Sequence, residues 1–487
     1  MSSTQQREEM PAATRASVAV DLGAESCRVS LLRWANGLPH MQLVHRFANG
    51  PVLAPDGTMR WPLDQILSGV DHGLRLCAEL APEGIRSLGV DGWAVDYVRL
   101  DVSGNPLEAP FCYRDERNAA AADQLHQRIS PDRLREITGL QLQPLNTLYQ
   151  RFADHLAAKP DGAVWLNLPE YLLHRWGGRP VAEYSNATHT QMIDLQTRHW
   201  SPEILQTAEL PPATMPEIVC AGTLVGKLRG PLADLPAFAD TALIAPACHD
   251  TASAVAGIPA AGEDWAYISL GTWSLVGTPV LQPCNGEEAR AEQFTNLGLD
   301  RDRTLLQKNV NGMWLLKQCM LHWEEQGSPW EIAALCAAAE LAPTPDTLLD
   351  VDDPELLKMG DMPARINTQR QTRDLTPLDE SSAAAPAMAS LIFHSLAARY
   401  ATLLQQLERL SGKQFTRIYA VGGASRNAFL RRLTEEASGK PVLLGSPESS
   451  TVGNFALQLA ALDASTAPSH ERAHRYAAML CDSSPVA

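Results

Sequence analysis

The sequence predicts an α/β protein with two related halves, and three observations lead to this fold class. The strand–turn–helix–strand order over residues 417–444 is a β-α-β unit, which implies parallel strands. Two strand–glycine turn–strand hairpins, at residues 17–32 and 265–277, each open one half of the chain and suggest duplication of one nucleotide-binding fold. The length of 487 residues fits two large domains, or about three at roughly 150 residues each.

The first half is expected to contain buried strands that end in polar turns. In chain order these elements are a strand at 17–21, a tight turn at 22–27, a return strand at 28–32, a strand at 87–91, a strand-like segment at 95–100 and an apolar strand at 241–247. Small residues at 252–256 then suggest a close-packed helix whose first turn contains Asp250 and Thr251. We place the domain junction at 260–264, just after this helix.

The second half contains the clearest helix, at 387–410, with one apolar stripe. Gly412 supplies its C-terminal stop. The β-α-β unit follows, with a strand at 417–421, a glycine turn at 422–424, a helix at 427–438 and a strand at 441–444. The segment 352–386 mixes Pro, Asp, Arg and Thr without periodicity, so we expect surface loops there.

Charge and composition exclude several classes of protein. Forty Lys and Arg against 56 Asp and Glu give a net charge of −16, which disfavours binding to nucleic acid and to anionic membranes. No apolar run approaches the roughly 18 residues that cross a bilayer. Residues 1–16 are polar and carry both charge signs, so we expect a loose tail and not a secretory signal. The nine cysteines form no C-x-x-C pair, which indicates free thiols and a cytoplasmic protein.

Three glycine-containing turns are candidates for phosphate binding. Asp21 ends a strand beside Gly23 and Ser26, where a carboxylate can hold Mg²⁺ and backbone N–H groups can approach phosphate. The turn at 270–272 could do the same, and 422–424 precedes a helix N-terminus that favours anions. An ordinary structural turn is the alternative for each. Neither G-x-G-x-x-G nor a P-loop is present.

The segment Cys248-His249-Asp250-Thr251 is the strongest candidate for chemistry. It follows an apolar strand, and ligands of open α/β sheets bind at the carboxyl ends of strands. Asp250 could accept the proton of an alcohol that attacks phosphorus; the alternative is a helix N-cap.

A second polar cluster, Asp91, Trp93 and Asp96, could bind a sugar through carboxylates and an indole face. The alternative is a packed Trp with capping aspartates. The sequence lacks H-E-x-x-H and G-x-S-x-G, which argues against a zinc protease and a serine hydrolase.

These segments together resemble the FGGY family of carbohydrate kinases, over roughly residues 17 to 458. Ten segments carry the resemblance, in order: VAVDLGAESCRV (18–29), VDGWAVDYVRLD (90–101), YRDERN (113–118), LNTLYQ (145–150), SNATHTQMID (185–194), CHDTASAV (248–255), YISLGTWSLVG (267–277), KNVNGMWLL (308–316), AVGGASRN (420–427) and ESSTVGNFALQ (448–458).

The resemblance implies an α/β fold of two actin-like, ribonuclease-H-type ATPase domains that flank a central nucleotide and sugar cleft. After a tail at 1–16, residues 17–260 would form the N-terminal domain, which binds the sugar and carries the catalytic base. Residues 261–487 would form the C-terminal, nucleotide-binding domain. The expected partners are a small sugar and ATP with Mg²⁺, with no nucleic acid and no membrane, in a monomer or homodimer.

The resemblance also assigns roles by matching motif. Asp250 would be the general base, and Asp21 would help to hold Mg²⁺. The residues expected to contact the ketose are Ala94, His249, Asp250, Thr251 and Asn309. The residues expected to contact the nucleotide or its phosphates are Ala24, Glu25, Ser26, Cys27, Arg28, Thr272, Lys317, Gly422, Gly423 and Ala424.

The implied reaction is ATP-dependent phosphorylation of L-rhamnulose at its 1-hydroxyl. A kinase of L-fuculose or of a pentulose is the nearer alternative, and a non-catalytic, nucleotide-dependent actin-like binding protein is the more distant one. The family usually has Gly where this chain has Cys27, Ala94 and Ala424, and often Gln at Lys317. Each added side chain could narrow a backbone approach to ligand.

Overall fold

The computed structural model describes residues 15–463, 465 and 469–482, and the chain divides into two compact units. Unit 1 consists of Met1–Ala261, Val280–Leu305 and Glu448–Ala487, and unit 2 of Gly262–Pro279 and Leu306–Pro447. Of the tail expected at 1–16, all but Arg15 and Ala16 lies outside the described residues. From the sequence we expect a sugar-binding domain up to residue 260 and a nucleotide-binding domain after it. The two spatial units each combine segments from distant parts of the chain, so this division by function stays a prediction.

The sheet of unit 1 has the strand order β11-β12-β6-β1-β2-β3. Its strands are β1 (Ala16–Leu22), β2 (Ser26–Ala35), β3 (Leu38–Ala48), β6 (Ile85–Gly92), β11 (Thr223–Lys227) and β12 (Ala242–Ala245). Strand β1 pairs antiparallel with β2 and parallel with β6, which pairs parallel with β12. The expected first hairpin and the strands at 87–91 and 241–247 are therefore confirmed.

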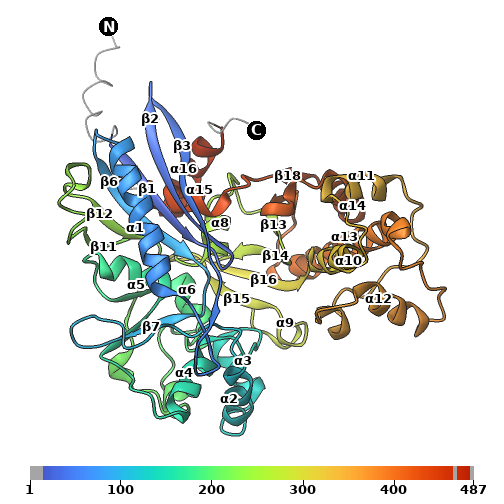
Figure 1. Ribbon diagram of the computed structural model, residues 1–487, viewed down its shortest axis with the longest axis horizontal. Coiled ribbons are helices and arrows are strands. Elements are labelled where there is room, and N and C mark those ends of the chain that lie inside the picture. The colour runs from blue at the N-terminus through green and yellow to red at the C-terminus, as the bar shows by residue number, and fades with distance from the viewer. Residues whose placement is uncertain (1–14, 464, 466–468, 483–487) are drawn as a thin grey trace. The chain divides into compact units, whose positions relative to one another are not determined.

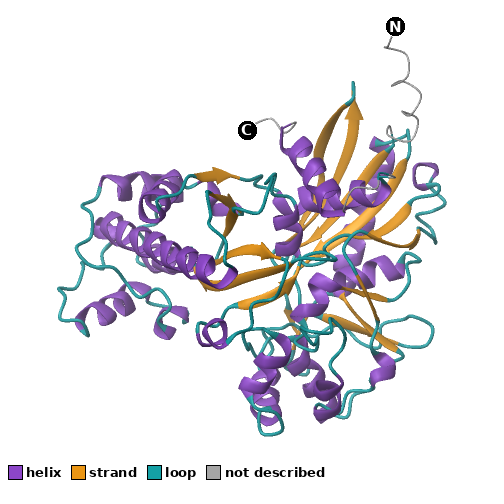
Figure 2. Cartoon of the chain, turned by 180° about the vertical axis from the view of Figure 1, so that it is seen from behind, coloured by secondary structure: helices purple, strands orange, loops and turns teal. Residues whose placement is uncertain are grey.

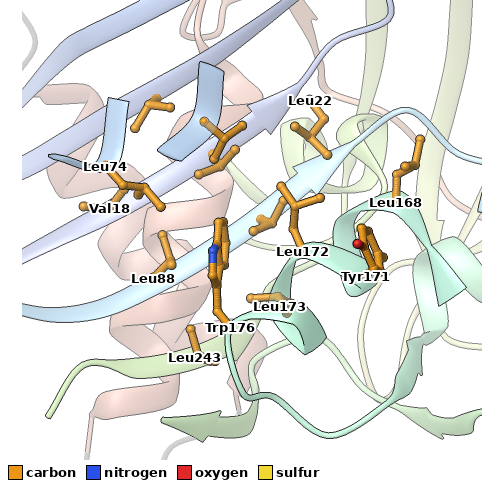
Figure 3. Close-up of a cluster of buried hydrophobic side chains, with 14 of the residues drawn as sticks. Val18, Leu22, Leu74, Leu88, Leu168, Tyr171, Leu172, Leu173, Trp176 and Leu243 are labelled. Carbon is orange, nitrogen blue, oxygen red and sulfur yellow. The ribbon is translucent and has the colours of Figure 1, made fainter. Parts of the chain in front are cut away.

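Alternation along β1 divides the core of unit 1 between two faces of the sheet. Val18, Val20 and Leu22 belong to a cluster with α1 (Leu63–Leu80) and α5 (Leu168–Arg175). Figure 3 shows side chains from β1, β6 and α5 pointing toward one another in this cluster. Ala19 instead packs with residues of α15 (Ser449–Leu462) and α16 (Ser469–Asp482). The period-2 pattern of a strand buried on both sides explains this division.

Helix α8 (Asp250–Ala256) crosses α15 at very short range near its middle and its C-terminal end. A Cβ at Gly453 would lie 1.8 Å from the Ser253 carbonyl oxygen. A Cβ at Gly257 would lie 2.3 Å from the Ser449 carbonyl oxygen. Glycine at both positions is therefore a packing requirement.

The rest of unit 1 consists of short strands and helices. The strands are β4 (Val52–Leu53), β5 (Met59–Arg60), β7 (Tyr97–Leu100), β8 (Val164–Asn167), β9 (Val181–Glu183), β10 (Glu217–Val219) and β15 (Thr295–Gly298). The helices are α2 (Arg117–Leu125), α3 (Pro131–Thr138), α4 (Thr147–Leu156), α6 (Tyr184–His189), α7 (Pro202–Thr207), α9 (Glu287–Ala291), η1 (Pro212–Thr214) and η2 (Pro236–Phe238). The strand-like segment expected at 95–100 is β7, which pairs with β8 outside the main sheet.

The strands of unit 2 follow the order β16-β14-β13-β17-β18. They are β13 (Trp265–Leu270), β14 (Trp273–Val280), β16 (Thr304–Asn311), β17 (Arg417–Val421) and β18 (Val442–Leu444). Strand β13 pairs antiparallel with β14 and parallel with β17, which pairs parallel with β18. This order matches β3-β2-β1-β6-β12 of unit 1, which confirms the expected repetition of one fold.

Along unit 2, β13, β14 and β16 come first, a run of helices follows, and further helical segments lie between β17 and β18 (Figure 2 colours the helices and strands). The helices are α10 (Trp314–Glu325), α11 (Ile332–Leu341), α12 (Met362–Gln371), α13 (Ala385–Ser411), α14 (Ala428–Ser438), η3 (Pro354–Leu357), η4 (Ser382–Ala384) and η5 (Gly423–Arg426). Helix α12 lies in the segment expected to be loops. The expectation of loops is therefore wrong for this segment. The sequence of α12 has no apolar stripe that would indicate a helix, and the one helix signal is Asp361, which caps its N-terminus.

The longest helix of unit 2 agrees closely with its sequence prediction. Helix α13 ends at Gly412, which has the expected positive φ of 69°. The segment Ser382–Ser411 is long and apolar enough to cross a membrane by length and composition, yet 72% of its apolar window is buried. A core helix of a globular unit has these properties.

Candidate active site

Three aspartates gather at the strand ends of unit 1. Asp21 and Asp91 are direct register partners on the parallel strands β1 and β6. Asp250 is the first residue of α8, which follows β12. Burial raises the pKa of both other carboxyls, and the charge of Asp250 adds to the increase, as expected for neighbouring like charges. The N-cap interpretation of Asp250 is wrong, because His249 occupies that position.

Asp21 is held by a cation and a hydroxyl. Its Oδ2 accepts hydrogen bonds from Arg28 Nη1 and Ser450 Oγ, each at 2.9 Å. Arg28 lies opposite Asp21 in the β1–β2 register, so the hairpin itself brings the pair together. Burial raises the pKa of Asp21, and Arg28 opposes that increase.

Asp91 is fully buried behind this pair. Its Oδ2 accepts a hydrogen bond from Asn454 Nδ2 at 2.6 Å, and Gln458 Nε2 in turn donates to Asn454 Oδ1 at 2.7 Å. Burial, with the charge of Asp21 next, holds the pKa of Asp91 well above its ordinary value. Asp91 therefore supports the cluster from the interior and does not reach solvent.

Asp250 is the accessible member of the cluster. Its side chain keeps 39% of its surface exposed, against 7% for Asp21. Desolvation by the surrounding elements raises the pKa of Asp250 to about 6, against the hydrogen bond from Thr251 Oγ1 at 3.1 Å. A carboxyl with such a pKa is largely unprotonated near neutral pH and remains a competent proton acceptor.

Buried carboxyl groups anchor the turn that carries Asp250. Glu183 accepts hydrogen bonds from the Cys248 backbone N–H at 2.9 Å and from Ser185 Oγ. Ser185 Oγ in turn accepts the His249 N–H at 3.2 Å. Glu170 accepts the Glu183 N–H at 3.1 Å, and burial raises the pKa of Glu170 to about 8 and that of Glu183 to about 7. Neither glutamate is among the residues predicted from the sequence, although each is a lone acid in an apolar segment.

Glu170→Gln is expected to remove a pH-dependent loss of stability. The folded protein holds the Glu170 proton up to about pH 8, whereas an unfolded chain releases it near 4.5. The stabilisation is therefore complete below pH 4.5 and is lost as pH rises to 8. Between pH 6 and 8.5 the variant should gain roughly 2–3 kcal/mol relative to wild type in urea unfolding. Glu79→Gln, exposed on α1, is the control; equal pH slopes for wild type and Glu170→Gln would contradict this role.

The turn that carries Ala94 is strained and firmly held. Val95 has a φ of +73°, which is unfavourable for a β-branched residue. Its carbonyl accepts hydrogen bonds from Thr147 Oγ1 at 2.7 Å and Gln150 Nε2 at 3.2 Å. The Gly92 N–H donates to the Cys248 carbonyl at 2.9 Å, so this turn lies directly beside the turn of Asp250. Ala94 has a φ outside the positive range, so its methyl group adds no backbone strain.

The interpretation of Asp96 as a sugar ligand is wrong. Asp96 is fully buried and accepts hydrogen bonds from Trp61 Nε1 at 2.5 Å, Trp93 Nε1 at 3.0 Å and Gln150 Nε2 at 3.0 Å. Trp93 is also buried. The alternative of a packed Trp is confirmed, whereas the Asp96 carboxylate binds two indole N–H groups and an amide and does not cap a helix.

The loop between β1 and β2 contains the other expected phosphate contacts of unit 1. A Cβ at Gly23 would lie 2.3 Å from the Ser26 carbonyl oxygen, so this turn requires glycine. Ala24 is half-buried and Glu25 exposed, while Ser26 Oγ accepts a hydrogen bond from Arg46. The Cys27 side chain is buried in the hydrophobic core, and burial raises the pKa of its thiol to about 12. The thiol that replaces the usual glycine therefore points into the core.

Unit 2 brings several of the expected nucleotide contacts together at its strand ends. Thr272 is exposed at the β13–β14 turn, and its carbonyl accepts the Trp314 N–H at 3.0 Å. Lys317 is exposed one turn further along α10. Gly422 has a φ of +88°, and its Cβ would lie 2.7 Å from the Leu270 carbonyl oxygen, so glycine is required there.

Three further residues complete the expected set of unit 2. Gly423 is exposed, and a Cβ there would meet nothing within 4 Å. Ala424 lies in η5 with no positive φ, so its methyl group is accommodated. Asn309 Oδ1 is buried and has no hydrogen-bond partner in the described part of the chain, which leaves an acceptor for a ligand.

The residues around Asp21 fit a magnesium ion held mainly by substrate. Mg²⁺ in phosphoryl-transfer sites takes one or two carboxylates and completes its shell with water and phosphate oxygens. Within residues 15–463, 465 and 469–482, no group of three or more His, Cys, Asp or Glu side chains is arranged to hold a metal. Asp21, whose Oδ2 already accepts two hydrogen bonds, would be the one carboxylate ligand of such an ion, with water and phosphate oxygens completing its shell.

Comparisons with known proteins agree on one family. Residues 16–257 match the N-terminal domain and residues 266–462 the C-terminal domain of the FGGY family of carbohydrate kinases. A curated rhamnulokinase from Enterococcus faecalis is 36% identical over 456 residues, which cover 92% of this chain and 89% of that protein.

Solved structures show the same fold at low identity. A xylulose kinase from Lactobacillus acidophilus has a TM-score of 0.77 at 16% identity, covering 96% of both chains. A glycerol kinase from Plasmodium falciparum with ADP has a TM-score of 0.74 at 12% identity, covering 96% of this chain and 92% of that one. The expected α/β fold with two actin-like ATPase domains is confirmed.

Proposed function

Because this chain belongs to the FGGY family of carbohydrate kinases, we propose that it transfers the γ-phosphoryl group of ATP to the 1-hydroxyl of L-rhamnulose. The accessible Asp250 carboxyl, with a pKa near 6 at the carboxyl end of a sheet, is the observation that carries the proposed chemistry. The similarity to a rhamnulokinase over nine-tenths of the chain supports the substrate. The fold alone would also fit a pentulose kinase.

Asp250 takes the proton of the 1-hydroxyl in this mechanism. The hydroxyl oxygen attacks the γ-phosphorus, the bond from phosphorus to the bridging oxygen breaks, and ADP leaves with that electron pair. His249 and Thr251 flank the base and bind the ketose with Ala94 and Asn309. Most of the rate enhancement comes from positioning and charge neutralisation.

The nucleotide-binding residues of this proposal are those of the matching family motifs. The loop Ala24, Glu25, Ser26, Cys27 and Arg28 offers backbone N–H groups and one guanidinium to phosphate oxygens. Thr272, Lys317, Gly422, Gly423 and Ala424 border the nucleotide. Asp21 holds Mg²⁺, which neutralises phosphate charge when it is bound. We further propose a cytoplasmic enzyme that acts as a monomer or homodimer.

A panel of sugars tests the substrate. Release of ADP is measured with L-rhamnulose, L-fuculose, L-ribulose, D-xylulose and glycerol. We expect the highest kcat/KM for L-rhamnulose. A tenfold higher value for another ketose would move the substrate to that sugar, and ATP binding without sugar-stimulated ADP release would favour the binding-protein alternative.

The pH dependence of the reaction should report Asp250. The pKa of its carboxyl is raised to about 6, and only the unprotonated form accepts a proton, so kcat/KM for the ketose should fall about tenfold per pH unit below 6. The measurement is a pH profile from 4.5 to 8 at saturating nucleotide. The residual activity of Asp250→Asn is measured over the same pH range as a control for ionisation of ATP. If kcat/KM of this variant falls below pH 6 as it does in wild type, a group other than Asp250 causes the fall.

A further inference from the structure

A pair of histidine rings lies beside the candidate base. His189 ends α6 and His249 precedes α8, and their ring centroids are 4.0 Å apart with an interplanar angle of 54°. His249 Nε2 lies 3.3 Å from Asp250 Oδ1. His189 belongs to the segment 185–194, which has no role in the mechanism above.

Each ring leaves one buried nitrogen without a partner. His189 Nε2 and His249 Nδ1 have no hydrogen-bond partner among the described residues. Burial lowers the pKa of both imidazoles, that of His249 to about 3, so both rings are neutral at physiological pH. A buried nitrogen without a hydrogen-bond partner destabilises the protein. A ligand that can both donate and accept a hydrogen bond relieves this loss in either tautomer.

Residues at the start of α4 contact both His189 and the strained turn of Ala94. The His189 carbonyl accepts a hydrogen bond from Asn146 Nδ2 at 3.2 Å. Thr147, the next residue, donates to the Val95 carbonyl. The start of α4 therefore holds His189 and the Ala94 turn in one arrangement, and the His249 ring, tilted against the His189 ring, lies between His189 and Asp250.

We propose that His189 is a specificity-determining residue of the sugar site, whose Nε2 forms a hydrogen bond with one hydroxyl of the ketose other than the reacting one. This inference rests on the proposed function and deepens it. A hydroxyl suits a neutral imidazole because the hydroxyl can both donate and accept a hydrogen bond. An anionic substituent does not, because neither ring is charged and the nearby Asp250 carboxylate would repel it.

The test combines variants of His189 with ketoses that each lack one hydroxyl. Wild type should discriminate against one such deoxy analogue by roughly ten- to a hundredfold in kcat/KM. His189→Phe keeps an aromatic ring against His249 but removes both ring nitrogens. In this variant the lower kcat/KM for that one deoxy analogue should disappear, and the differences for the other deoxy analogues should remain. His189→Gln, which retains donor and acceptor atoms, should restore part of the discrimination.

A uniform loss of kcat/KM for every sugar in His189→Phe would overturn the proposal, because it would indicate packing against His249 alone. If the phenylalanine variant does not fold, His189→Leu carries the same comparison. The experiment uses the parent ketose that wild type phosphorylates best. If L-rhamnulose is not the substrate, the sugar panel with wild type shows it. If His189 does not bind a hydroxyl, only the comparison with the variant shows it.

Discussion

Asp250→Asn is expected to lower kcat at least a hundredfold while the dissociation constant for the ketose changes less than about threefold. The amide keeps the shape and a hydrogen-bonding oxygen but cannot take the proton of the 1-hydroxyl, and positioned general bases contribute roughly 10²–10⁴-fold. Turnover is measured by coupled ADP release, and binding by titration calorimetry. Asp123→Asn, at an exposed position of α2, is the matched control and should leave both constants unchanged.

The contrast between turnover and binding makes this prediction specific. A kcat within tenfold of wild type would remove Asp250 from the role of base. A loss of ketose binding equal to the loss of turnover would make Asp250 a binding residue only.

Gly453→Ala is expected to have the largest effect on stability. The new Cβ would lie 1.8 Å from the Ser253 carbonyl oxygen and 2.9 Å from the Gly257 nitrogen, so α8 and α15 must separate. Overpacking of this kind lowers the free energy of unfolding by about 3 kcal/mol, even though alanine favours a helix over glycine by about 1 kcal/mol. Because α8 begins with Asp250, kcat should fall as well.

Thermal unfolding and turnover of the purified variants check this prediction. Gly50→Ala is the matched control, because its Cβ would meet nothing within 4 Å and its φ is not positive. An unchanged midpoint for Gly453→Ala would mean that the two helices lie further apart than the structure places them.

Local patterns were sufficient for the framework and for the base. The hairpin at 17–32 and the β-α-β unit at 417–444 are encoded by strand alternation and glycine turns, which act over a few residues. Asp250 could be singled out because it directly follows an apolar strand. The buried position of Cys27 follows from the same alternation, since its neighbours Ser26 and Arg28 are more exposed.

Long-range contacts were beyond local patterns. The partner that fixes Asp96 is Trp61, 35 residues away, so the sequence alone left a sugar role open. Glu183 reaches the Cys248 N–H, and His189 reaches the His249 ring, only when the segment 181–189 packs against the turn of Asp250. No local signal shows that the segment 448–487 completes unit 1.

The position of phosphate in the product tests the central claim most directly. The chain is incubated with ATP, Mg²⁺ and L-rhamnulose labelled with ¹³C at C1, and the product is examined by NMR. We expect the C1 signal of the product to be split by coupling to ³¹P, and the amount of this product to equal the amount of ADP formed. Phosphate on another carbon, or free phosphate released with unaltered sugar, would contradict it.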